Sequence, residues 1–140
     1  MSISPDDIIL NKAAVIERCI RRIKEEYASD QELENFTHLD ALTLNIERAC
    51  QAAIDLAMYI VAQKRLGMPQ SSGDGFRLLA KAKLISRDME QALTAMTGFR
   101  NIAVHEYQEL DKSTLRYIAE SGYKDLIKFL NQLGVQISDE

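Results

Sequence analysis

The chain has 140 residues, 46% of them hydrophobic and 27% charged, which is enough to bury the core of one globular domain. Its 17 basic and 21 acidic side chains leave a net charge of −4. That balance argues against a protein coated with positive charge to wrap nucleic acid, although a local basic site stays open. With six glycines and two prolines, the sequence has too few turn residues for an all-β domain. These counts favour a helical fold.

We expect no segment that targets the chain to a membrane or out of the cell. No basic start is followed by an apolar run at the N-terminus, and the longest apolar stretch, 49–62, is too short to span a bilayer. Cys19 and Cys50 lie far apart without a CxxC spacing, so we expect buried, reduced thiols rather than a disulfide or metal framework. The prediction is a cytoplasmic protein without membrane contact.

Two long helices are predicted in the first half of the chain. The opening Ser4-Pro5 has the residue types of a helix start, and apolar residues recur every three or four positions over 9–27. A capping-box pattern at 29–32 predicts the second start, and its apolar stripe runs over 39–60. Gly67 predicts the end of this second helix, which would be about 35 residues and about 50 Å long.

Three further helices are predicted in the second half. We expect Asp74 to cap a short third helix and Ser86 to cap a fourth. A final helix is expected to begin near Asp111 and to end at Gly134, and residues 135–140 are expected to be a frayed tail.

These elements predict an all-α fold, an antiparallel up-and-down four-helix bundle with one extra short helix. Without repeats or linkers, the whole of 1–140 is expected to form a single domain. A long coiled-coil rod is the alternative, but the loop at 67–74 would fold the chain back on itself.

Histidine is scarce, which limits the possible metal sites. The two histidines, His38 and His105, are not paired at helical spacing, and no HExxH sequence occurs. We therefore predict no metal site and no cofactor. His38 is expected to be a surface or capping residue, and the Gly-Asp-Gly sequence at 73–75 a turn rather than a phosphate-binding loop.

A polar block at 98–107, GFRNIAVHEY, is the strongest candidate for chemistry. On one regular helix Arg100 and His105 would lie about 140° apart, at about 100° per residue. They could then not reach the same atom. Either the helix breaks between them, or a second subunit completes the site.

The residue types of this block suit the cleavage of a phosphodiester bond in RNA. An imidazole such as that of His105 can move a proton from the ribose 2′-OH or to the leaving oxygen. The Arg100 guanidinium can bind a phosphate and its developing charge, and Asn101 can hold either partner by hydrogen bonds. Tyr107 offers a hydroxyl that can bond a phosphate or be modified. The structural alternative is that the Arg, Asn and His side chains only satisfy one another at a helix end.

The same block resembles a known family. Arg100 and His105 match the Arg-x4–6-His motif of HEPN ribonucleases, and the block is similar to the RN-x-x-VH-x-Y segment of HepT-type toxins. Asp55-Leu56-Ala57 and the loop LGMPQSS at 66–72 are also similar to HepT, so the resemblance covers nearly the whole chain.

The resemblance implies a metal-independent endoribonuclease toxin of a toxin–antitoxin system. It would be active as a homodimer with the two motifs facing each other, Arg100 and His105 as the catalytic pair and Asn101 in support. It also implies a partner, the nucleotidyltransferase antitoxin MntA, which would transfer AMP from ATP to Tyr107. A bulky negative group there would exclude the RNA phosphate.

Further residues are candidates from position alone. Arg48 and Asp55 lie seven apart on one side of the second helix and could brace the cleft or only each other. Five basic residues are candidate phosphate contacts, although each could be only a solvated surface residue: Arg18, Arg21, Arg22, Lys81 and Lys83.

Two other functions remain open. The chain could be a non-catalytic helical partner that docks a nucleotidyltransferase and helps to bind its nucleotide, or an antitoxin-like scaffold in which the polar block is purely structural.

Overall fold

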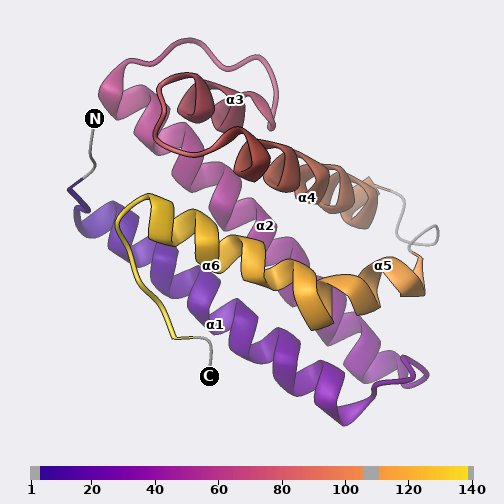
Figure 1. Cartoon of the computed structure of the whole chain (residues 1–140). Coiled ribbons are helices and arrows are strands. Elements are labelled where there is room, and N and C mark those ends of the chain that lie inside the picture. Colours follow the sequence, from indigo (N-terminus) through magenta and orange to yellow (C-terminus); the bar gives the residue numbers. More distant parts are fainter. Residues whose placement is uncertain (1–3, 106–110, 139–140) are drawn as a thin grey trace.

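The computed structural model describes residues 4–105 and 111–138, and every regular element in these ranges is helical (Figure 1). In chain order, the helices are α1 Asp7–Ser29, α2 Phe36–Lys64, α3 Asp74–Lys81, α4 Arg87–His105, α5 Lys112–Tyr117, the π-helical turn η2 Ile118–Gly122, and α6 Tyr123–Gln132. Helices α1 and α2 form a long antiparallel pair, α4 and α6 pack on it, and the short α3 lies beside α4 (Figure 1). The predicted all-α bundle with one extra short helix is confirmed.

The starts of the first two helices differ from the prediction. Asp6, not Ser4, caps α1, because its carboxylate accepts a hydrogen bond from the Ile9 N–H at 2.9 Å. The start predicted at 29–32 is wrong. The Asp30 carboxylate there accepts from backbone N–H groups further along the loop, and Asn35 caps α2 instead. Helix α2 therefore has 29 residues, fewer than expected.

The predicted apolar stripes form the core of the bundle. Along α2 the inward positions are fully or almost fully buried: Leu42, Ile46, Ala49, Ala53, Leu56 and Ile60. Phe76 of α3 meets Phe129 of α6 edge to face, with ring centroids 5.7 Å apart. Cys19 and Cys50 are free and buried as predicted, and burial raises the pKa of the Cys50 thiol to about 12.

The C-terminal helix is less regular than its sequence suggests. It begins near Asp111 as predicted, and Asp111 caps it by accepting a hydrogen bond from the Ser113 N–H at 2.9 Å, but the π-helical turn η2 separates α5 from α6. Beyond Gly134 the chain was expected to fray. Instead Val135 is buried and the Ser138 N–H donates to Glu17 of α1 at 2.8 Å, so residues 135–138 pack back onto the bundle.

The loop between α1 and α2 is held by a polar cluster. Glu26 is almost buried, with its side chain 11% exposed, and accepts hydrogen bonds from Arg22 and from the His38 ring, the latter at 2.6 Å. His38 is thus a half-buried residue of the helix junction rather than a cap, since Asn35 caps α2. The hydrogen bond from His38 is the main cause that lowers the pKa of Glu26 below its ordinary value.

Glu26→Gln is expected to destabilise the protein by about 1 kcal/mol near neutral pH. Because folding lowers the Glu26 pKa, the stabilisation exists above the ordinary carboxyl pKa and is lost as the pH falls through the folded-state pKa. Urea unfolding of both proteins from pH 7 to pH 3 measures this. Glu25→Gln is the matched control, because Glu25 also pairs with Arg22 but is exposed. Parallel stability curves for wild type and Glu26→Gln would contradict the prediction.

Candidate functional site

Arg100 lies in the last two turns of α4, on the side that faces α2. Its Nη1 donates to Asn101 Oδ1 at 3.2 Å, and its positive charge acts on the Cys50 thiol of α2. The guanidinium is half-buried, and its Nε is buried without a hydrogen-bond partner among the described residues. A buried donor without a partner costs free energy, so this guanidinium retains capacity for a further acceptor.

Helix α4 continues without a break from Arg100 to its last residue, His105. The alternative of a helix break between the two residues is therefore wrong. At about 100° per residue, the two backbone positions lie about 140° apart around the helix axis. Tyr107 lies outside the described residues. Within one chain, α4 alone does not bring positions 100 and 105 to one point.

Arg48 and Asp55 are not partners of each other in the described part of the chain. Asp55 is ion-paired with Lys12 of α1 at 3.4 Å and accepts a hydrogen bond from Gln51 at 2.8 Å. Arg48 lies near the buried Cys19 and lowers the pKa of its thiol, against the stronger opposite effect of burial. Both residues thus lie along the contact between α1 and α2.

The candidate phosphate contacts fall into two groups. On α1, Arg22 is ion-paired with Glu25 and Glu26 of its own helix, so its charge is largely neutralised there, whereas Arg18 and Arg21 are exposed. Around the end of α3, Lys81 and Lys83 are exposed and have basic neighbours.

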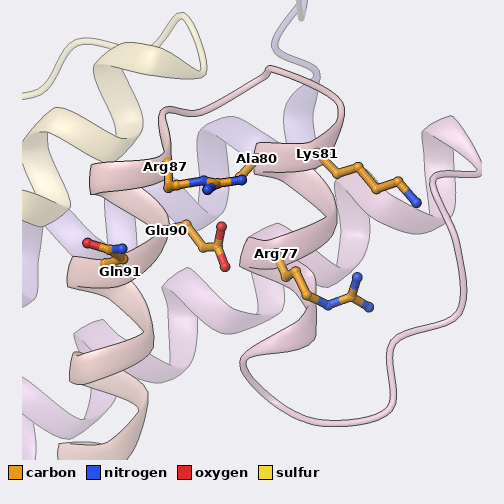
Figure 2. A pocket seen from close by; sticks show the side chains of 6 residues that line it. All are labelled: Arg77, Ala80, Lys81, Arg87, Glu90 and Gln91. Carbon is orange, nitrogen blue, oxygen red and sulfur yellow. The ribbon is translucent and has the colours of Figure 1, made fainter.

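A hollow of about 480 Å³ lies between α3 and α4, and Lys81 lines it together with Arg77 and Arg87 (Figure 2). The sequence interpretation missed these two arginines. The four-residue spacing of Arg77 and Lys81 was a possible signal for one shared helix face. Nothing in the spacing of Arg87 could have placed it at the same hollow, because the hollow depends on how α3 packs against α4.

The described residues contain no group of three or more His, Cys, Asp or Glu side chains that could hold a metal ion. Among the helices of these same ranges, none has the length and apolar character needed to cross a membrane.

Comparison with known proteins identifies the family. Residues 16–133 match the family model described as Ribonuclease HepT-like. The chain belongs to the HepT-like family. It is 42% identical over 127 residues to the mRNA nuclease HepT of Shewanella oneidensis, covering 90% of this chain and 96% of that protein. A tRNA nuclease HepT of Aphanizomenon flos-aquae is 26% identical over 106 residues, covering 74% of this chain and 72% of that protein.

Solved structures show the same fold. A toxin–antitoxin complex with AMP-PNP contains a chain with a TM-score of 0.88 and 42% identity, covering 92% of this chain and 98% of the other. The tri-AMPylated Shewanella oneidensis HEPN toxin in complex with MNT antitoxin gives the same TM-score and identity, covering 93% and 98%. The resemblance found in the sequence is confirmed.

Proposed function

We propose that this chain is the ribonuclease toxin of a toxin–antitoxin system, and that it cuts cellular RNA by metal-independent acid–base chemistry. Membership of the HepT-like family supports ribonuclease activity, and the relatives include nucleases of mRNA and of tRNA. The observation that carries the mechanism is the unbroken helix from Arg100 to His105.

That unbroken helix supports a site shared between two copies of the chain. Since positions 100 and 105 diverge by about 140° on one α4, a second α4 that faces the first across a twofold axis would pair each arginine with the histidine of the other copy. The homodimer would then carry two equivalent clefts.

In each cleft His105 would act as the general acid–base. It would take the proton from the ribose 2′-OH, whose oxygen attacks the adjacent phosphorus, and a proton would be returned to the 5′-oxygen that leaves. An imidazole is suited to both steps because its ordinary pKa lies close to neutral pH.

Arg100 would bind the phosphate that is cut and stabilise the charge that develops on its oxygens. The buried Nε supports this role, since it has no hydrogen-bond partner in the part of the chain that the structure describes. Asn101, which accepts a hydrogen bond from Arg100, would orient the guanidinium. Arg48 and Asp55 would act further away as positioning residues on α2.

An antitoxin similar to MntA would silence this site. The structural relatives include a toxin–antitoxin complex with AMP-PNP and a tri-AMPylated toxin with its MNT antitoxin. By analogy, the antitoxin would transfer AMP from ATP to the Tyr107 hydroxyl with release of pyrophosphate. The added phosphate and nucleoside would repel and displace the RNA from the cleft.

The test of this function is the incubation of the purified chain with a mixed pool of cellular RNA in EDTA. We expect cleavage at an unchanged rate, because the proposed proton transfers use only side chains. Gel analysis of the RNA measures it, with an identically purified His105→Ala protein as the blank. Loss of cleavage in EDTA that Mg²⁺ restores would overturn the metal-independent mechanism.

A further inference from the structure

We propose that the hollow between α3 and α4 binds backbone phosphates of the RNA substrate at a distance from the bond that is cut. This inference rests on the proposed ribonuclease function and adds a second contact region to it. The region is called the α3–α4 basic hollow, and its charged residues are Arg77, Lys81, Arg87 and Glu90.

The charge of the α3–α4 basic hollow is opposite to that of the whole chain. Three cations and one carboxylate line it, in a protein with a net charge of −4. In Figure 2, Arg77 and Lys81 extend to the same side of α3, while Arg87 reaches from α4 towards Ala80. Arg77 makes one long contact with Asp74, 3.4 Å from Nε to Oδ1, and stays half-exposed. A concentration of positive charge of this kind attracts the phosphates of a nucleic acid.

A second hollow continues the basic surface around the end of α3. It has a volume of about 520 Å³, shares Ala80 and Arg87 with the first, and adds Lys83. Two adjacent concave surfaces with four basic side chains can contact more than one phosphate. This arrangement suits an extended polymer better than a single small anion.

The register of α4 relates the hollow to the proposed catalytic residue. Arg87 and His105 are 18 residues apart on this unbroken helix, which is five turns at 3.6 residues per turn and about 27 Å at 1.5 Å per residue. Their backbone positions therefore lie on the same side of the helix. An RNA strand that runs along this side of α4 can therefore contact both the hollow at Arg87 and the position of His105.

The side of α4 that connects Arg87 with His105 carries no acidic residue of its own. The positions within about 40° of this side are all exposed: Gln91, Thr94, Gly98 and Asn101. Helix α4 has no acidic residue after Glu90. A Cβ added at Gly98 would have no neighbour within 4 Å, so the helix surface is open at its middle.

The experiment is RNA binding by the full chain as a function of salt. The inactive His105→Ala protein is compared with and without Lys81→Gln and Arg87→Gln, using a fluorescent 20-nucleotide single-stranded RNA and anisotropy. We expect a roughly tenfold or larger loss of affinity at about 0.1 M salt. The slope of log K against log salt should fall by about 1.4, at about 0.7 per phosphate contact on a single strand.

The matched control is Lys124→Gln with Lys128→Gln. These two lysines are exposed one turn apart on α6, and their replacement removes the same charge. The control should keep the affinity and the slope of the parent. Equal losses in both double variants would overturn the proposal, because the effect would then be one of net charge. No loss in the hollow variant would also overturn it.

A cleavage assay separates this proposal from the proposed function. In the active protein the hollow variant should raise KM about tenfold and leave kcat unchanged, since the hollow does not touch the reacting atoms. If wild type fails to cut RNA, the proposed function is wrong. The salt dependence of RNA binding still tests the hollow in that case. If the variant loses binding to the nucleotidyltransferase and keeps RNA binding, the hollow is a protein interface and the proposal is wrong.

Discussion

His105→Ala is expected to lower RNA cleavage by about 10²–10⁴-fold while the protein stays folded. The imidazole is the only proposed group that moves protons during the reaction, and the loss of a positioned acid–base typically has this magnitude. Initial rates on a defined RNA measure the effect, and thermal unfolding shows that the bundle is intact. Full activity in a folded His105→Ala protein would contradict the mechanism.

His38→Ala is the matched control for this substitution. His38 is the other histidine of the chain, and its ring is bonded to Glu26 at the junction of α1 and α2. We expect a loss of stability and no loss of cleavage at a temperature where the variant is folded. Equal losses of cleavage in both histidine variants would indicate a general structural effect.

Arg100→Ala is expected to abolish cleavage as well, and Arg100→Lys should restore little of it. A lysine keeps the charge but lacks the planar fork that binds two phosphate oxygens. The Arg100→Ala and His105→Ala variants together also permit a test of the shared cleft. If each cleft takes its arginine from one copy and its histidine from the other, mixed Arg100→Ala and His105→Ala dimers contain one complete cleft.

Mixing the two inactive proteins under subunit exchange should therefore recover about a quarter of the wild-type rate. Random pairing makes half of the dimers mixed, and one of their two clefts is intact. If both residues of a cleft came from the same copy, mixing would rebuild no intact cleft, because each mixed dimer would carry two defective sites. No recovery after verified exchange would thus rule out the proposed dimer.

Tyr107→Phe is expected to make the toxin resistant to its antitoxin. Without the hydroxyl no bond to the AMP phosphorus can form, so no negative group is added to block the RNA. After incubation with the nucleotidyltransferase and ATP, intact mass should show added AMP on wild type and none on the variant. RNA cleavage should be silenced only in wild type.

Tyr117→Phe serves as the control, because Tyr117 is a tyrosine of α5 with 58% of its surface exposed. It should be modified and silenced like wild type. Added AMP on the Tyr107→Phe protein would mean that another side chain is the acceptor. If isolated wild type cuts no RNA at all, a non-catalytic partner of the nucleotidyltransferase becomes the better interpretation.

The positions of the helices could be predicted well because the apolar periodicity of a helix is formed by residues that are close together in the sequence. The stripes over 9–27 and 39–60 identify both long helices, and the start of the last helix near Asp111 was predicted correctly. The start of α2 was predicted wrongly because a capping pattern shows which hydrogen bonds a side chain can make, but not whether a helix follows it. Asp30 makes its bonds within the loop, where they compete with helix formation.

The sequence by itself determined the helical fold, the family and the candidate residues Arg100 and His105, since these depend on periodicity and on a short block of residue types. Only the tertiary structure decided that α4 continues through His105, because helix continuity depends on packing along the whole element. It also decided that Arg87 lines the same hollow as Arg77 and Lys81, and that Asp55 pairs with Lys12. Such pairs join residues from different helices, and only the packing of one helix on another brings them together.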